Sequence, residues 1–122
     1  ALPHVTEDSD LILSGDFNSG SHLDWTDPSI HHGYGNLRLP VSLYMAEQGF
    51  KDSFREVNPD ETSRSEGTWA VTFGHLQHDR IDYIYYKGPR LKAIHSKIIR
   101  TAPEIDDVWA SDHAAVNTVF SY

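Results

Sequence analysis

The chain has 122 residues, of which 39% are hydrophobic, and it contains no cysteine. This length fits one small domain with an ordinary core, and the lack of cysteine excludes disulfides, thiolate chemistry and cysteine-ligated zinc. Eighteen acidic and ten basic residues give a net charge of -8, which disfavours sequence-independent nucleic-acid binding, because such binding depends on Lys and Arg replacing phosphate counterions.

Residues 1–9 are predicted to form a polar connection. This segment is too polar for a signal peptide, and no apolar run reaches the roughly 18 residues that a membrane span needs. A leader, if the protein has one, lies upstream, so the sequence leaves the compartment undetermined.

The run Leu11–Leu13 predicts a short buried strand that stops at Ser14-Gly15. Asp16 then stands at the C-terminal lip of that strand. Residues 19–36 are rich in Gly, Pro, Ser, Asp and His, which predicts a long loop. Loops of this length are often functional.

A helix is predicted next, with Pro40 in its first turn and Gly49 as a left-handed stop. Its apolar stripe consists of Leu39, Leu43, Ala46 and Phe50. Ser53 opens a capping box with Glu56. This box predicts a short second helix, which Asn58-Pro59 would end before a charged loop.

The pattern then changes to strands, predicted over residues 68–73, 80–86, 91–99 and 113–120. One strand, a helix and several further strands make an α+β or α/β arrangement. The pattern alone does not specify the fold further.

The first of three polar tetrads, Gly15-Asp16-Phe17-Asn18, follows the first strand. Asp16 and Asn18 are two residues apart, so in an extended segment both side chains project to one side and Phe17 points to the core. A Gly-Asp turn in which Asn18 caps the backbone explains the tetrad equally well.

The second tetrad is Arg80-Ile81-Asp82-Tyr83, where strand alternation places Arg80 and Asp82 on one face. A charged residue in so apolar a strand needs a partner, because unpaired burial is costly. In one alternative, Arg80 and Asp82 pair with each other. The third tetrad, Ala110-Ser111-Asp112-His113, precedes the last strand, and read alone it indicates a cap or turn.

In their order and spacing, the three tetrads resemble the endonuclease/exonuclease/phosphatase superfamily of metal-dependent phosphoesterases. Asp82 follows Asp16 by 66 residues, and Asp112 follows Asp82 by 30. The resemblance implies that residues 10–122 are the C-terminal half of a four-layer αββα sandwich, a mostly antiparallel sheet with a covering helix. The family's N-terminal half, with its principal metal-binding Glu, has no counterpart upstream of Asp16, so residues 1–9 would end that missing half.

The resemblance also implies a role for each polar residue of the tetrads. Asp16 would orient and deprotonate the attacking water and contact the metal, while Asn18 would hold the water or a phosphoryl oxygen. Asp112 would be a metal ligand. His113 would donate a hydrogen bond to a non-bridging phosphoryl oxygen, and Asp82 would fix the tautomer of His113 and favour its protonated form.

The implied cofactor is Mg²⁺ or Mn²⁺, which would also offset the repulsion between an acidic protein and a phosphate ester. His22, Trp25 and Arg80 are candidates for substrate binding together with Asn18, and Trp25 would stack on a ring of the substrate. A solvated loop anchored by one Trp is the simpler reading of His22 and Trp25. A zinc site at His75 and His78 is disfavoured, because zinc needs a third strong ligand nearby.

Two functions are therefore predicted. The first is divalent-metal-dependent hydrolysis of a phosphate ester, as a phosphodiesterase, phosphatase or nuclease, once the N-terminal half is supplied; the isolated chain is expected to be inactive. The substrate would be a small molecule, a phospholipid head group or a nucleotide, and charge disfavours nucleic acid. The alternative is a non-catalytic module that associates through an exposed sheet face. The stretch His22–Thr26 resembles one in secreted bacterial members, which is the single hint about localisation.

Overall fold

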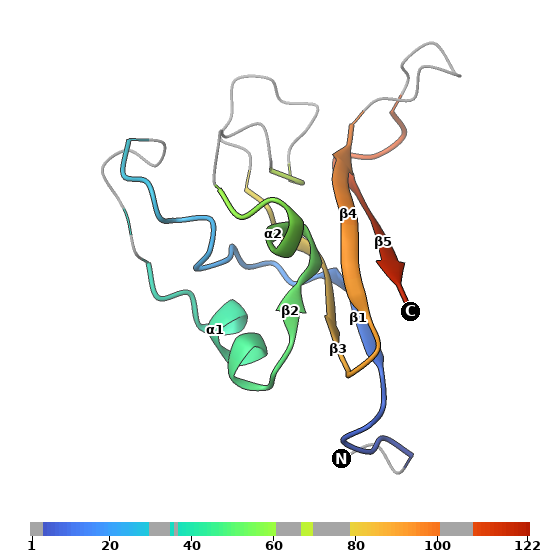
Figure 1. The fold of residues 1–122 in the computed structure, drawn as a ribbon. Coiled ribbons are helices and arrows are strands. Elements are labelled where there is room, and N and C mark those ends of the chain that lie inside the picture. Colours follow the sequence, from blue (N-terminus) through green and yellow to red (C-terminus); the bar gives the residue numbers. More distant parts are fainter. Residues whose placement is uncertain (1–3, 30–34, 36, 61–66, 70–78, 101–108) are drawn as a thin grey trace.

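The structure is a computed structural model, and its described residues contain five strands and two helices (Figure 1). The described residues are 4–29, 35, 37–60, 67–69, 79–100 and 109–122. In chain order the elements are β1 (Leu11–Asp16), α1 (Pro40–Glu47), β2 (Lys51–Asp52), α2 (Ser53–Val57), β3 (Asp82–Lys87), β4 (Lys92–Ile99) and β5 (Ala115–Ser121). The predicted α+β class is confirmed.

The strands form two antiparallel sheets, one with the order β1-β3-β2 and the other with the order β4-β5. β1 pairs with β3 along its whole length, from Leu11 opposite Lys87 to Asp16 opposite Asp82. Residues that lie opposite each other in a ladder share a face. The register therefore brings Asp16 and Asp82 to the same face and the same end of the sheet.

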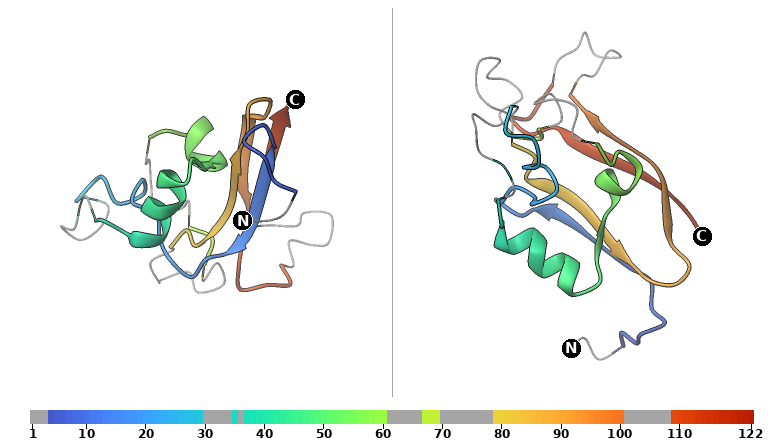
Figure 2. Two further views of the ribbon diagram at one scale, coloured as in Figure 1. Left: turned by 90° about the horizontal axis from the view of Figure 1, so that it is seen from below. Right: turned by 60° about the vertical axis from the view of Figure 1, so that its left-hand side comes forward.

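Both helices lie on one side of the strands, as the left view of Figure 2 shows. The core on this side is built from Met45 of α1 and from Tyr83 and Tyr85 of β3, with Phe17 and Phe50 packed against them. The ring of Phe17 meets the rings of Tyr83 and Tyr85 edge-on, at centroid distances of 5.8 and 5.2 Å. Phe17 thus points to the core, as predicted.

The prediction that the first strand is buried is wrong. Ile12 is 54% exposed and Leu13 is 45% exposed, and the strand continues beyond Gly15 to Asp16. β1 lies at the edge of its sheet, and β3 is the described element that it mainly contacts. An apolar run specifies a strand, but its burial depends on what packs over it.

The apolar stripe predicted for α1 is also not the face that is buried. Ser42 and Met45 are the buried residues of the helix, whereas Ala46 is exposed and Leu43 is half-buried. Ser42 tolerates burial because its hydroxyl has hydrogen-bond partners in the preceding loop and turn. The predicted stop is confirmed, since Gly49 adopts a φ of +80°.

The cap of α2 is Asp52, one residue before the predicted Ser53. Oδ1 of Asp52 accepts hydrogen bonds from the backbone N–H groups of Phe54 and Arg55, at 3.0 and 3.4 Å. The buried hydroxyl of Ser53 instead lies 2.8 Å from the hydroxyl of Thr118 on β5. Asp and Ser are both good caps, so their order in the sequence could not decide between them.

The later strands agree with the predicted ranges to within two residues at each end. β3 begins at Asp82 instead of residue 80, and β5 begins at Ala115 instead of residue 113. Of the strand predicted over residues 68–73, only Thr68 and Trp69 are described, and Trp69 forms an isolated bridge with His113. Neither described helix is long and apolar enough to span a bilayer.

Candidate active site

Three ionisable side chains, one from each of the three tetrads, meet at one end of the strands. Asp16 ends β1, Asp82 begins β3, and His113 lies just before β5. Their nearest ligand atoms all lie within 4.8 Å of one another. Asp16 is exposed, while Asp82 and His113 are half-buried. The fold therefore gathers residues that are far apart in the sequence into one solvent-accessible cluster.

His113 and Asp82 make the contact that the family resemblance predicts. Nδ1 of His113 lies 2.8 Å from Oδ2 of Asp82. This hydrogen bond raises the pKa of His113 above its ordinary value of 6.5; partial burial opposes the rise, and the charges of Asp82, Asp16 and Asp112 add to it. The protonated ring carries a second N–H at Nε2, which is a suitable donor to an anionic oxygen.

Asp16 and Asn18 do not lie on a common extended segment. β1 ends at Asp16, and Asn18 adopts a left-handed φ of +48°, which Asn tolerates better than most residues. Oδ1 of Asp16 accepts the backbone N–H of Asn18 at 2.7 Å. A turn is therefore present, but Asp16 and not Asn18 caps it, and the argument for parallel side chains fails at Asn18.

Arg80 does not pair with Asp82, so that alternative is wrong. Its Nε and Nη2 donate to the two carboxylate oxygens of Asp24, at 2.9 and 2.7 Å, and Nη2 also donates to Asp52 at 2.6 Å. Arg55 donates to the same Asp24 at 2.7 Å. Burial alone would lower the pKa of Arg80, but Asp52 and Asp24 outweigh it and raise that pKa, so the guanidinium stays charged.

We call Asp24, Asp52, Arg55 and Arg80 the buried charge cluster. All four residues are buried, and Arg80 is only 5% exposed. The cluster joins the loop after β1 to α2 and to the residues that lead into β3. The role of Arg80 in substrate binding stays a prediction.

Two other candidates of the loop, His22 and Trp25, lie against neighbouring backbone and helix. The backbone N–H of His22 donates to the hydroxyl of Ser42 at 2.8 Å, and Nδ1 of His22 lies 2.8 Å from the same hydroxyl. Trp25 packs beside Gly20, where a Cβ would lie 3.1 Å from Nε1 of the indole. The His22 contacts anchor the loop to α1, and the substrate-binding roles of both residues stay predictions.

Asp112 is exposed and lies outside the three-residue cluster, although its charge acts on His113. The hydroxyl of Ser111 accepts the backbone N–H of His113 at 3.0 Å. The third tetrad thus contains the turn that its sequence indicates, and metal binding by Asp112 stays a prediction. His75 and His78 lie outside the described residues.

Three residues around His113 were missed by the sequence analysis. The rings of Trp69 and His113 lie 4.8 Å apart, and Nε1 of Trp109 donates to the carbonyl of His113 at 2.6 Å. Thr68 precedes Trp69 and is fully buried. Trp109 stands immediately before the third tetrad, which was a usable signal, whereas nothing in the sequence brings residues 68 and 69 to His113.

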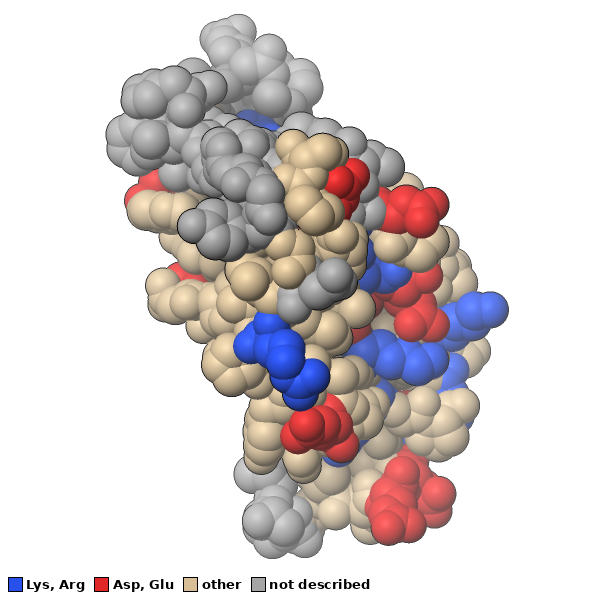
Figure 3. Space-filling model, turned by 90° about the vertical axis from the view of Figure 1, so that its left-hand side faces the viewer, with Lys and Arg blue, Asp and Glu red and all other residues tan. Residues whose placement is uncertain are grey.

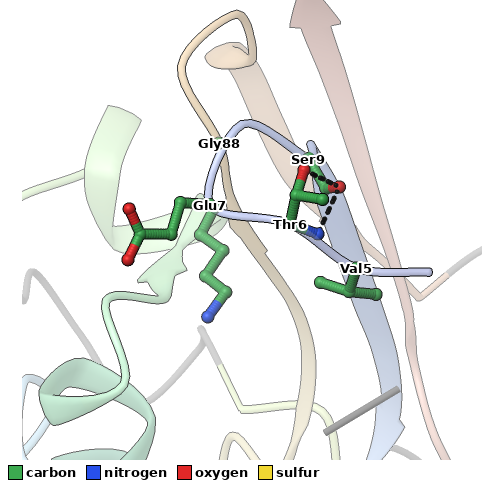
Figure 4. Close-up of a pocket in the computed structure, with 6 residues that line it drawn as sticks. Val5, Thr6, Glu7, Ser9 and Gly88 are labelled. Carbon is green, nitrogen blue, oxygen red and sulfur yellow. Dashed lines mark hydrogen bonds between the residues drawn. The ribbon is translucent and has the colours of Figure 1, made fainter. Parts of the chain in front are cut away.

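A groove of about 270 Å³ adjoins the cluster. Small residues make up much of its lining, which consists of Ser14, Gly15, Asp82, Tyr83, Ile84, Ala114, Ala115 and Val116. A second hollow of about 370 Å³ lies beside the N-terminal turn (Figure 4) and includes Lys87. Lys87 ends β3, about 17 Å of strand from Asp82, so the second hollow is separate from the cluster.

The donor atoms of the cluster suit a hard divalent cation. Carboxylate oxygens are preferred by Mg²⁺ and Mn²⁺. The hydrogen bond to Asp82 favours protonated His113, and a protonated imidazole cannot ligate a metal. Asp16 would therefore hold the ion, with Asp112 as the predicted second ligand and Asp82 engaged by His113.

Residues 2–113 match the Endonuclease/Exonuclease/phosphatase family, and the chain belongs to this family. The resemblance inferred from the three tetrads is thereby confirmed.

The chain is also similar to a protein of Caenorhabditis elegans described as "Uncharacterized protein F14F9.5". The two are 38% identical over 94 residues, which cover 68% of this chain and 30% of that protein. The chain thus matches less than a third of the length of this relative. No solved structure matches significantly.

Proposed function

We propose that this chain carries part of the catalytic site of a divalent-metal-dependent phosphoesterase. The observation that supports this most is the meeting of Asp16, Asp82 and His113 within 4.8 Å at the ends of three separate segments. Two carboxylates and an imidazole of raised pKa in an accessible position are the groups that hydrolysis of a phosphate ester needs.

Each residue has a separate task in this proposal. Asp16 is exposed at the end of β1 and orients and deprotonates the attacking water, while Asn18 holds the water or a phosphoryl oxygen. Protonated His113 donates from Nε2 to a non-bridging phosphoryl oxygen. Asp82 holds the imidazole in that state. Mg²⁺ or Mn²⁺, bound by Asp16 and Asp112, would supply further neutralisation of phosphoryl charge.

The net charge of -8 favours a small phosphate ester over duplex nucleic acid. On the face in Figure 3, Lys and Arg side chains lie among Asp and Glu side chains, without a continuous basic area among the described residues. The groove beside the cluster is small, at about 270 Å³. A small phosphodiester or monoester, a phospholipid head group or a nucleotide fits this charge balance.

We also propose that residues 10–122 form the C-terminal half of a four-layer αββα sandwich, with residues 1–9 leading in from the other half. Both helices lie on one side of the strands (Figure 2). Ile12 of β1 is 54% exposed and points to the opposite face from Leu13, whose ladder partner Tyr85 packs with Met45 of α1. A second sheet packed over β1 would cover such apolar surface. The N-terminal half would also supply the metal-binding Glu that the family resemblance implies.

A non-catalytic role is the second candidate, and the exposed apolar side chains of β1 favour it. In this role the chain binds a partner through Ile12 and its surroundings and hydrolyses nothing. Light scattering of the isolated chain tests the surface itself, because a clean monomer at high concentration would argue against an associating face.

The experiment for the main proposal is hydrolysis of a chromogenic phosphodiester and a chromogenic phosphomonoester. It compares the isolated chain with the intact protein, by which we mean a protein that contains this chain together with the proposed N-terminal half. Each is measured with Mg²⁺, with Mn²⁺ and with EDTA. We expect turnover by the intact protein that EDTA abolishes, and none by the isolated chain. Folded intact protein without metal-dependent turnover of either ester would contradict the proposal and favour the binding role.

A further inference from the structure

Thr68 occupies the point where the second and third tetrads meet. It is completely buried, and it lies outside all three tetrads. Its side chain and both of its backbone polar groups have hydrogen-bond partners in other segments. This one small residue therefore connects several segments by hydrogen bonds.

The hydroxyl of Thr68 binds two successive backbone amides. Its Oγ1 accepts the N–H of Ile81 at 3.0 Å and the N–H of Asp82 at 3.0 Å. In a regular strand, successive N–H groups point to opposite edges, so one oxygen cannot accept both. The chain is therefore bent at Ile81-Asp82 into a concavity that surrounds the Thr68 oxygen. This bend sets the backbone from which the Asp82 side chain projects.

The backbone of Thr68 reaches the third tetrad at the same time. Its carbonyl accepts the N–H of Ala114 at 2.7 Å, and its N–H donates to the carbonyl of Asp79 at 2.9 Å. The next residue, Trp69, forms a bridge with His113. One residue thus fixes the backbone at Asp82 and the backbone beside His113, which are the two ends of the 2.8 Å side-chain contact.

The first tetrad is tied to the same bend from the other side. The N–H of Phe17 donates to the carbonyl of Ile81 at 2.9 Å. The hydroxyl of Tyr83 lies 2.5 Å from the carbonyl of Arg80 and 3.0 Å from that of Ser19. The bend is therefore held between the segment that carries Asp16 and the segment that carries Thr68.

We propose that Thr68 is a positioning residue for the phosphoesterase site, an inference that rests on the proposed function. Its hydroxyl oxygen sets the direction of Asp82 and its carbonyl sets the place of His113. A fully buried residue does not touch substrate, so its effect must act through these two residues. An error of about 1 Å in the placement of such groups lowers turnover by roughly 100-fold.

The experiment compares Thr68→Val, which keeps the shape and removes the acceptor, with Thr68→Ser, which keeps the acceptor, in the intact protein. Thr118→Val is the matched control, because Thr118 Oγ1 lies 2.8 Å from the hydroxyls of Ser53 and Ser96, away from the cluster. We expect kcat to fall about 100-fold in Thr68→Val with KM unchanged. Thr68→Ser should stay within about threefold of the original kcat, as should Thr118→Val.

Amide hydrogen exchange tests the bend without relying on turnover. The amides of Ile81 and Asp82 should lose protection in Thr68→Val and keep it in Thr68→Ser and Thr118→Val. If the original protein hydrolyses no ester, the proposed function fails while the exchange result still decides whether Thr68 holds the bend. Unchanged kcat and protection in Thr68→Val would overturn the inference.

Thr68→Ser keeps the test decisive even if Thr68→Val does not fold. In that case Thr68→Ser alone is compared with Thr118→Val. Retained kcat and retained protection in Thr68→Ser support the inference. A loss of either one would overturn the inference, because the hydroxyl oxygen, which Ser retains, would then not be enough to hold the bend and position the site.

Discussion

The buried charge cluster and the Asp16-Asp82-His113 cluster each contain two aspartates, but they differ in their cationic partners and in their exposure to solvent. The buried cluster pairs two carboxylates with two guanidinium groups, and its side chains are at most about a tenth exposed. The other cluster has two carboxylates around one titratable imidazole, and Asp16 is exposed. Arg80 and Asp82 are two residues apart in the chain, yet they belong to different clusters.

The difference indicates which of the two groups holds the fold and which is available for chemistry. Removing one partner from a buried ion pair leaves an uncompensated charge, so the buried cluster is expected to govern stability. The accessible cluster has fewer cations than carboxylates and retains room for a ligand. It is expected to govern reaction rate while contributing little to stability.

Asp16→Asn should produce the largest effect, a fall in kcat of about 100- to 10,000-fold, because the general base is removed. Stability should change little, since the Asn side chain retains an oxygen that can accept the N–H of Asn18. Steady-state hydrolysis by the intact protein measures the effect. The control is Glu7→Gln, which changes an exposed carboxylate beside the hollow of Figure 4 and should behave as the original protein. Near-normal turnover by Asp16→Asn would contradict the assignment of Asp16 as the general base.

Arg80→Met should lower the free energy of unfolding by about 3–5 kcal/mol, because Asp24 and Asp52 lose a buried partner. Urea denaturation measures this change. Arg80→Lys should lose less free energy of unfolding than Arg80→Met, because an ammonium keeps the charge. It should still be less stable than the original protein, because it cannot form the bidentate contact with Asp24. A loss below about 1 kcal/mol for Arg80→Met would place the buried cluster among weak surface pairs.

Asp82→Asn should lower the pKa of His113 toward 6.5, because the hydrogen bond to a carboxylate is the main cause of its raised value. A raised pKa in the folded state stabilises the protein fully below the unfolded value near 6.5, and this stabilisation is lost as pH rises through the folded value. NMR titration of the His113 ring measures the pKa. The pH dependence of unfolding should flatten above pH 6.5 in the variant, and an unchanged His113 pKa would contradict this account.

Lys51→Ala should have the smallest effect, a loss of about 0–1 kcal/mol. Lys51 lies 3.3 Å from Glu56 in an ion pair whose side chains are 57% and 31% exposed. Thermal unfolding at low and high salt checks this, because screening should remove the difference from the original protein. A loss comparable to that in Arg80→Met would erase the distinction between buried and exposed pairs.

The sequence predicted which residues form the site better than it predicted their hydrogen-bond partners. The three tetrads indicated where Asp16, Asp82 and His113 lie on their strands, because local patterns specify local structure. Only the family resemblance predicted the contact between Asp82 and His113. The partner of Arg80 could not be predicted, because Asp24 lies 56 residues away in a loop whose path no local pattern specifies.

Burial was harder to predict than secondary structure. The strand of Ile12 and Leu13 was expected to be buried, and the stripe of α1 through Ala46 was expected to face the core. Both elements exist, but neither buries the expected side chains, since burial depends on neighbours that are distant in sequence. Thr68 escaped notice for the same reason, because its hydrogen-bond partners belong to other segments.

The most direct test measures kcat and the free energy of unfolding together for His113→Ala and for Arg80→Met in the intact protein with Mg²⁺. The account predicts that His113→Ala loses about 100-fold or more in kcat with nearly unchanged stability. Arg80→Met should lose stability, and the molecules that stay folded should keep more activity than His113→Ala. Near-normal turnover in folded His113→Ala would contradict the claim that the accessible cluster carries the chemistry.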